Sequence, residues 1–329
     1  MTGDRGRAGG HLGLGPGAEF DRIRAIAAAL GPAAARLGDD CALIADPCGT
    51  LALSTDVSVE GVHFRREWLT PEEIGWRAAA AALSDLAAEG AETVGLLAAV
   101  SVPADAPAAD IVALMRGVGD AAVSAGGVVL GGDLSTAPVW SAAVTVVGRA
   151  ERPVTRAGAR PGDRVWVTGA LGAARAALDA WRRGGEPAPD ARRAFAHPEP
   201  RIAAGRKLAA LGARAMLDLS DGLGGDAAHL AAASRVALAI DLGLVPVAPA
   251  AVAEAHRCGL APARYAAEGG EDYELLVVLP PEFGDRSAPD LQQACGVPVT
   301  LIGWVHDGSG VRFSSRGAEV ALSGFDHFR

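Results

Sequence analysis

The sequence predicts a two-domain protein of mixed α/β class, with one sheet in each half of the chain. The length of 329 residues exceeds what one small core usually organises. Apolar, β-branched runs alternate with alanine-rich helical runs, as in α/β domains. A polar stretch rich in Arg, Gly and Pro, residues 149–163, interrupts that alternation. We therefore expect a flexible tail over residues 1–17, an N-terminal domain over residues 18–148 and a C-terminal domain over residues 149–329.

The first domain should contain strand, helix, strand, helix, strand, strand. The first strand is expected from Leu51 to Phe64. The helix after it should begin at Thr70-Pro71, a capping residue and a proline suited to the first turn, and run to about Ala88. The remaining elements are a strand over residues 93–102, a helix over 108–124 and strands over 128–130 and 139–147.

The second domain should restart with a short strand over residues 165–167, the turn Gly169-Ala170-Leu171-Gly172 and a helix. Such a turn before a helix can bind an anion, although turns of this kind are common. Further helices are expected over residues 201–211 and 222–234, and strands over 215–219, 237–242, 273–279 and 299–303.

The composition excludes several classes of protein. A net charge of −9 without basic runs argues against nucleic acid or an anionic membrane as a partner. Lys207 is the single lysine, so no P-loop lysine or Schiff base elsewhere in the chain can act. Four scattered cysteines without zinc-ligand spacing, and no signal peptide or membrane span, lead us to expect a cytoplasmic protein.

Acidic residues stand in or beside apolar stretches at several places along the chain. Burying a carboxylate costs several kcal/mol unless it is paired or metal-bound. Because no basic residue is an immediate neighbour in the sequence, a divalent cation is the expected partner. These acids are Asp39, Asp40, Asp56, Asp85, Asp133, Asp218, Asp221, Glu271 and Asp272.

Each acid also has a plainer interpretation. Asp56, flanked by the hydroxyls of Ser54 and Thr55, suits Mg2+ but could lie on an exposed strand face. Asp133 follows two glycines that let a ligand approach, yet it could belong to a simple turn. Asp85 could be the one polar residue that a helix shows to solvent.

The acids of the second domain have alternatives too. Asp221 could be a helix cap, which would leave Asp218 in the strand unexplained. Glu271 and Asp272 should point to opposite sides of a strand, and Glu271 is the favoured ligand contact. His63 could contact a phosphate or simply lie at the surface. So many acids facing a polyphosphate would require several Mg2+ ions, which indicates phosphoryl transfer rather than glycoside hydrolysis.

Nine short motifs follow one another along nearly the whole chain, and any one alone would be weak evidence. They are Ala18-Glu-Phe20, Gly38-Asp-Asp-Cys-Ala-Leu43, residues 54–64, Leu83-Ser-Asp-Leu-Ala-Ala88, Gly131-Gly-Asp133, residues 155–163, Asp218-Leu-Ser-Asp-Gly-Leu223, Gly269-Gly-Glu-Asp-Tyr-Glu-Leu275 and Gly324-Phe-Asp-His-Phe328. In this order and register they resemble the thiamine-monophosphate kinase family, in the superfamily of aminoimidazole ribonucleotide synthetase and selenophosphate synthetase.

The resemblance implies a ferredoxin-like N-terminal domain that dimerises through its sheet, an α/β C-terminal domain and ATP bound near their junction. It implies the last step of thiamine diphosphate synthesis, in which the γ-phosphate of ATP passes directly, in line, to thiamine monophosphate. The acceptor phosphate is already anionic, so no general base is needed, and Asp56, Asp133 and Asp221 would support the transfer.

Position by position, the resemblance assigns three groups of residues. Those similar to the Mg2+ ligands are Asp40, Ser54, Thr55, Asp56, Asp85, Asp133, Asp218 and Asp221. Gly132, Arg156 and Ser220 resemble nucleotide contacts. His63, Glu271 and Phe325 resemble substrate contacts.

Two other functions stay open. One is an ATP-dependent enzyme of the same superfamily with a different substrate, although residues 59–64 and 269–273 favour the thiamine branch. The other is a non-catalytic, nucleotide-binding homodimer. Its best support is Leu134-Ser-Thr-Ala-Pro138, because the family has a threonine and a nearby arginine after Gly-Gly-Asp. Ala82 likewise replaces the asparagine usual in the family.

Overall fold

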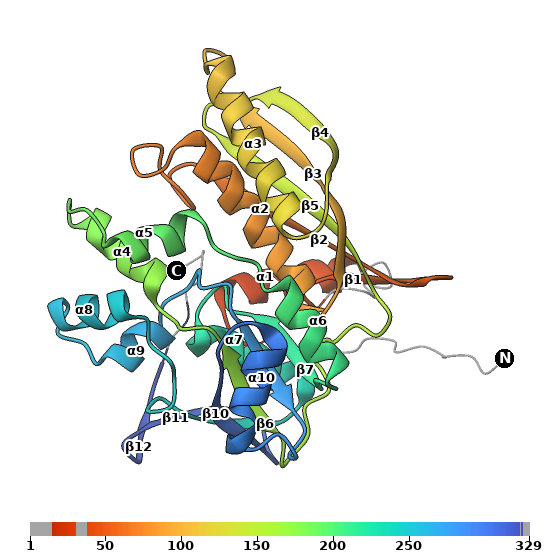
Figure 1. Ribbon diagram of the computed structural model, residues 1–329, viewed down its shortest axis with the longest axis vertical. Helices are drawn as coiled ribbons and strands as arrows, with labels where there is room; N and C mark the ends of the chain where they lie inside the picture. Colours follow the sequence, from red (N-terminus) through yellow and green to blue (C-terminus); the bar gives the residue numbers. More distant parts are fainter. Residues whose placement is uncertain (1–14, 31–37, 323, 325–329) are drawn as a thin grey trace.

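The computed structural model describes residues 15–30, 38–322 and 324, and these form two sheets that lie one above the other in Figure 1. The expected two-domain α/β architecture is confirmed, whereas the boundary at residue 149 and the tail over residues 1–17 stay predictions. None of the helices in the described part is long and apolar enough to cross a membrane. The elements of the first half are α1 (Ala18–Leu30), β1 (Ala42–Asp46), β2 (Gly49–Val59), α2 (Pro71–Ala88), β3 (Glu92–Val102), α3 (Ala108–Ser124), β4 (Val129–Thr136) and β5 (Ser141–Ala150).

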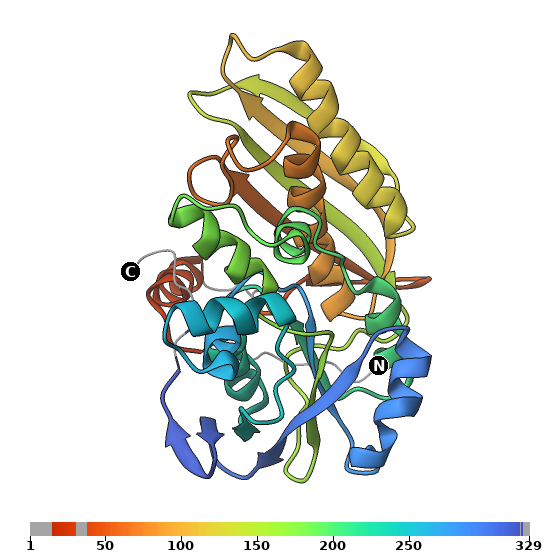
Figure 2. The ribbon, with the colours of Figure 1, turned by 60° about the vertical axis from the view of Figure 1, so that its left-hand side comes forward.

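The first sheet has the strand order β1-β2-β5-β3-β4. β5 pairs antiparallel with both β2 and β3, and β3 pairs parallel with β4. Helices α2 and α3 cover one face (Figure 2), and the alternating burial of β5 shows that the other face is open. The predicted order of elements from β2 to β5 is confirmed, and β4 is longer than expected.

Helix α2 is the central element of the molecule. Thr70 and Glu73 form the expected capping box, and Pro71 occupies the first turn. A Cβ on Gly75 would lie 1.9 Å from the Leu114 carbonyl oxygen, so α2 and α3 touch through their backbones. At its other end, α2 meets the second domain just as closely, since a Cβ on Gly205 would lie 2.0 Å from the Ala87 carbonyl oxygen. Side chains of α2 therefore reach the junction between the domains.

The second sheet has the order β12-β11-β8-β10-β6-β9-β7. Its strand β9 is buried at every position, which suits a strand with helices or loops on both sides. The elements are β6 (Arg164–Thr168), α4 (Ala173–Arg182), α5 (Pro189–Ala196), α6 (Ile202–Ala210), β7 (Ala215–Asp218), α7 (Leu223–Ser234), β8 (Ala237–Asp241), α8 (Pro249–Arg257), α9 (Pro262–Ala267), β9 (Leu275–Leu279), η2 (Asp285–Ser287), α10 (Ala288–Cys295), β10 (Val299–His306), β11 (Gly310–Ser315) and β12 (Ala318–Val320).

The expected strand over residues 273–279 begins later than predicted. Glu271 and Tyr273 have positive φ angles of 69° and 51°, a conformation that no regular strand contains. Their backbone N–H groups donate to the carbonyls of Ser220 and Leu219, respectively, at 2.7 and 2.9 Å. The segment before β9 is therefore an irregular loop fastened to the end of β7.

The polar linker between the domains is held firmly at three points. The Val154 N–H donates to the carbonyl of Glu89, at the end of α2, over 3.1 Å. The Met216 N–H of β7 donates to the carbonyl of Thr155 over 3.1 Å, and the Ser234 hydroxyl of α7 donates to that of Arg156 over 2.8 Å. The linker thus fixes Arg156 at the domain junction.

Candidate active site

Three predicted acids meet at the domain junction although they lie far apart in the sequence. Asp40 precedes β1, Asp85 belongs to α2 and Asp218 ends β7. One carboxylate oxygen from each lies within 4.8 Å of the others, an arrangement that could hold a metal ion. The alternative in which Asp85 simply faces solvent is wrong, because close packing of α2 against both domains brings its side chain to this cluster.

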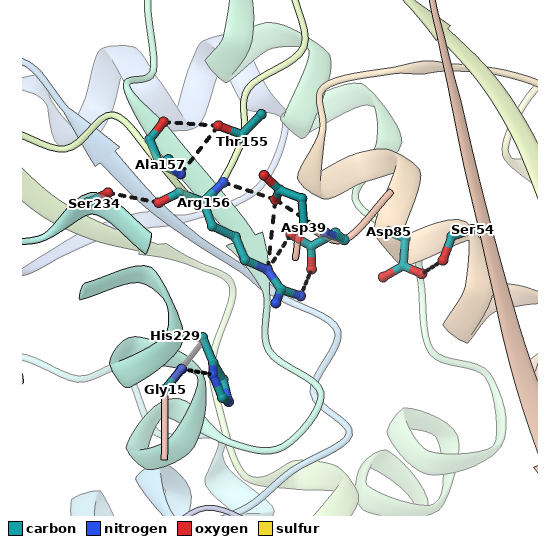
Figure 3. Close-up of polar contacts among 10 residues, drawn as sticks. Gly15, Asp39, Ser54, Asp85, Thr155, Arg156, Ala157, His229 and Ser234 are labelled. Atoms are coloured by element: carbon teal, nitrogen blue, oxygen red, sulfur yellow. Dashed lines mark hydrogen bonds and ion pairs between the residues drawn. The ribbon is translucent and has the colours of Figure 1, made fainter. Parts of the chain in front are cut away.

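Strand β2 adds Ser54 and Asp56 to the same side. The Ser54 hydroxyl donates to Asp85 over 2.5 Å (Figure 3). Asp56 lies two residues further on and so points to the same, helix-covered face of the sheet. These oxygens extend the cluster between the first sheet and α2.

Burial raises the pKa of the clustered carboxyls. It is the first cause for Asp56, Asp85 and Asp218, and the neighbouring carboxylates raise each pKa further. The pKa of Asp218 rises to about 7, although the nearby Ser84 hydroxyl opposes the shift. Because these buried carboxyls resist ionisation by themselves, a divalent cation beside them would stabilise their ionised form.

Arg156 contacts both Asp40 and Asp39, and Figure 3 shows its side chain beside Asp39. Its Nε and Nη2 donate to the two oxygens of Asp40 over 3.0 and 2.5 Å, and its backbone N–H donates to Asp39 over 3.1 Å. The expectation that metal alone offsets the acids is therefore wrong for Asp40. The sequence separates this pair by more than a hundred residues, so inspection of near neighbours could not reveal it.

Glu271 also has a cationic partner that the sequence did not indicate. It forms an ion pair with Arg77 of α2, whose side chain is 4% exposed. Arg77 also donates to the Phe195 carbonyl over 2.7 Å and lies over the Phe195 ring. Glu271 and Asp272 have different partners, since Asp272 accepts a hydrogen bond from the Gly172 N–H over 2.8 Å. They lie in a loop before β9, so the strand alternation expected for this pair is not what separates them.

The turn at Gly169 is a poor anion site. A Cβ on Gly169 would lie 1.8 Å from a carboxylate oxygen of Glu274, and Asp272 takes the Gly172 N–H that begins α4. The protein's own carboxylates thus occupy the position where an anion would bind. The anion-binding interpretation of this turn is wrong.

Asp221 and Ser220 lie in the loop between β7 and α7, next to Asp218. Asp221 is not the cap of α7, because the cap position belongs to Gly222 and carries no side-chain bond. Instead, the Asp221 N–H donates to Asp226 over 3.1 Å. Since Glu271 N–H holds the Ser220 carbonyl, this loop is joined to the Arg77–Glu271 pair.

Other predicted site residues lie elsewhere in the chain. Thr55 points to the open face of the first sheet, where its hydroxyl pairs with that of Thr145 over 2.8 Å. Asp133 lies on the edge strand β4. Its partner in the neighbouring strand β3 is Ala99, which is exposed. Three strand spacings, about 14 Å, separate β4 from β2. One chain therefore does not bring Thr55 or Asp133 to the cluster.

The last predicted contacts have mixed outcomes. Gly132 lies on β4, where a Cβ would come within 1.9 Å of the Ala98 carbonyl oxygen. His63 lies in the turn after β2, and its Nδ1 accepts from the Val59 N–H over 3.1 Å. Phe325 lies outside the described residues.

Three buried ionisable residues near the cluster were missed. Glu89 ends α2, Asp226 lies in the first turns of α7, and Arg77 is in the first half of α2. The signal available was weak: each is a charged residue within a stretch of Ala, Leu and Gly.

Known proteins match this chain along most of its length. Residues 38–150 match the N-terminal domain of AIR synthase related protein, and residues 160–315 match its C-terminal domain. Thiamine-monophosphate kinase of Escherichia coli (strain K12) is 36% identical over 324 residues, which cover 94% of this chain and 95% of the relative. The chain belongs to the thiamine-monophosphate kinase family.

Other members of the thiamine-monophosphate kinase family agree. The Mycobacterium tuberculosis (strain H37Rv) kinase is 37% identical over 252 residues, covering 75% of this chain and 74% of the relative. The structure of AaThiL complexed with AMPPCP and TMP is 33% identical, with a TM-score of 0.85 over 94% of this chain and 97% of that one. The family predicted from the motifs is confirmed.

Proposed function

We propose that this protein transfers the γ-phosphate of ATP to thiamine monophosphate, giving ADP and thiamine diphosphate. The observation that carries the proposal is the meeting of Asp40, Asp85 and Asp218 at the domain junction. It supports phosphoryl transfer because such a reaction needs charge neutralisation and alignment more than a nucleophilic side chain. Kinases that are 36% identical over nearly the whole chain support the choice of substrate.

The acidic cluster fits Mg2+ as the metal. Its donors are carboxylate and hydroxyl oxygens, the ligands this hard cation prefers, and their pKa values are raised by burial. Asp40, Ser54, Asp56, Asp85, Asp218 and Asp221 would hold the ions. Bound Mg2+ would supply positive charge to the phosphates of ATP. We propose several ions, because the acids extend beyond one coordination sphere.

The protein's own groups would orient the two substrates. Arg156, fixed by the linker and by Asp40, presents a guanidinium group at the junction, where it can contact a phosphate. Ser220, beside Asp218, is a second proposed nucleotide contact. The acceptor phosphate is ionised at neutral pH, so transfer proceeds in line without a general base. His63, Glu271 and Phe325 are the proposed contacts of thiamine monophosphate.

We further propose that the enzyme is a homodimer and that the second copy completes the site. The open face of the first sheet exposes large apolar side chains, among them Val57 and Leu97 at 50 and 41%. Asp133 and Thr55 lie on this same face. In a dimer formed through this sheet, the second copy would be the source of the Asp133 and Gly132 that complete the site.

Two experiments test these proposals. Incubation with ATP, Mg2+ and thiamine monophosphate should yield equal amounts of ADP and thiamine diphosphate, and none in a chelator; ADP without thiamine diphosphate would contradict the proposed substrate. Co-expression of Asp85→Asn and Asp133→Asn chains should restore about a quarter of the wild-type activity if each site uses both copies. Activity no higher than that of either inactive variant would contradict the shared site.

Four free cysteines agree with the proposed cytoplasmic location.

A further inference from the structure

A second group of carboxylates adjoins the candidate active site. Oxygen atoms of Asp39, Asp40 and Glu89 all lie within 4.8 Å of one another. Glu89 follows Asp85 by four residues at the end of α2, so the two project from the same side of the helix one turn apart. Asp40 is common to both groups. Neither Asp39 nor Glu89 has a role in the proposed transfer.

Glu89 gives this group its significance. The residue is 0% exposed, and neither carboxylate oxygen has a hydrogen-bond partner of normal geometry among the described residues. The Cys41 backbone N–H and Arg156 lie near enough to lower its pKa, but burial, followed by Asp39, raises it well above the ordinary value. A buried carboxylate without partners costs several kcal/mol, so some other group should satisfy it.

The charges of the group do not balance within the protein. The Arg156 side chain bonds to Asp40 and lies 3.9 Å from Asp39, to which its backbone N–H also donates; none of these contacts extends to Glu89. Three carboxylates facing one guanidinium leave two negative charges, which one divalent cation would neutralise. Opposite ligands of Ca2+ lie about 4.8 Å apart and those of Mg2+ about 4.2 Å apart, so the observed spacing accommodates such an ion.

We propose that Asp39, Asp40 and Glu89 form a second divalent-cation site, which fastens the interdomain linker to the end of α2. The linker already meets this end of α2 through the Val154 N–H and Glu89 carbonyl, and Asp39 through the Arg156 N–H. An ion here would join the same two parts through side chains. The site would be structural, and it does not depend on the identity of the phosphate acceptor.

Mn2+ binding without nucleotide tests the proposal. Chelator-treated wild-type protein, Glu89→Gln, Asp39→Asn and Asp218→Asn are titrated with Mn2+, and free Mn2+ is counted by electron paramagnetic resonance. Glu89→Gln and Asp39→Asn should each bind one ion fewer than wild type. Asp218→Asn, which alters the neighbouring group alone, should keep the ion that these two variants lose. The double variant Glu89→Gln/Asp218→Asn should then lose more binding than either single variant.

Thermal unfolding gives a readout separate from ion counting and from activity. In chelator, Glu89→Gln should be at least as stable as wild type, because the amide removes an uncompensated buried charge. With Mn2+, wild type should gain more in Tm than Glu89→Gln. Equal ion numbers and equal Tm gains in the two proteins would overturn the proposal and indicate a protonated Glu89. Loss of the same single ion in Glu89→Gln and Asp218→Asn, with no further loss in the double variant, would reduce the two groups to one site.

Discussion

Arg156 and Asp40 form a two-pronged ion pair across the domain junction, with Nε and Nη2 of the arginine on the two carboxylate oxygens. The side chains are 17 and 2% exposed. The pair holds the linker against the acidic cluster, and it raises the pKa of Arg156 above its ordinary value although burial opposes this. Removal of one partner should therefore affect both stability and the site.

Replacement of Arg156 by alanine should lower the free energy of unfolding by about 3–5 kcal/mol, because a buried carboxylate loses its cation. Arg156→Lys should lose less but should not recover the two-pronged geometry. The control is Arg116→Ala, whose side chain is 60% exposed and 3.9 Å from Glu72; it should cost less than about 1 kcal/mol. Urea unfolding measures all three, and equal losses for Arg156→Ala and Arg116→Ala would contradict the importance of the pair.

The main elements around the cluster were predictable because their signals are local. The capped start of α2 and the apolar runs of β2, β3 and β7 all gave elements close to those observed. Short helices such as α5 and α9 were missed, since eight and six residues give too few turns for a recognisable period. The five-residue edge strand β1 was also missed.

The site could be predicted in its residue types but not in its partners. Acids in apolar surroundings pointed to Asp40, Asp56, Asp85 and Asp218. The ion pairs of Asp40 with Arg156 and of Glu271 with Arg77 could not be predicted, because tertiary packing alone brings these residues together. Strand alternation puts Thr55 and Asp56 on opposite sides of the sheet. Which of the two reaches the cluster depends on the face that the helices cover, and the sequence does not show this.

The metal-free protein should become less stable as pH rises through the pKa of Asp218. Burial raises that pKa to about 7. The carboxyl stabilises the folded state fully below its unfolded pKa near 4, and this contribution is lost as pH increases towards 7. Asp218→Asn removes the titration. In chelator, the free energy of unfolding of Asp218→Asn minus that of wild type should therefore increase between pH 4.5 and 8, by on the order of 3 kcal/mol. A difference that does not change with pH would contradict the raised pKa of Asp218.

Arg77 and Glu271 should be energetically coupled. Glu271→Ala leaves the buried guanidinium without its carboxylate and should destabilise the protein by about 3 kcal/mol. The double variant Arg77→Met/Glu271→Ala should lose less than the sum of the single variants, with a coupling of about 1 kcal/mol or more. Additive losses in urea unfolding would show that the pair contributes nothing. The KM for thiamine monophosphate should rise in Glu271→Ala if this residue contacts the substrate.

Helix α1 should detach from the second domain in acid. The Gly15 N–H donates to Nδ1 of His229 over 2.9 Å (Figure 3), and Phe20 packs against the imidazole. Burial lowers the pKa of His229 to about 3, so its neutral form stabilises the fold above pH 6.5 and this is lost as pH falls towards 3. Hydrogen exchange of α1, corrected for intrinsic rates, should increase between pH 7 and 4. His229→Phe should show no such pH dependence, and identical pH profiles for the two proteins would contradict the role of His229.

The most direct test of the account is the activity of Asp85→Asn, since Asp85 joins β2, α2 and Asp218 in one cluster. Thiamine diphosphate formation from ATP and thiamine monophosphate is measured in Mg2+ for wild type, Asp85→Asn and the control Asp105→Asn, an exposed residue before α3. Wild type and Asp105→Asn should turn over equally, and Asp85→Asn should be inactive while folded and at least as thermally stable in chelator. Near-normal activity of Asp85→Asn would contradict a metal-dependent transfer at the domain junction.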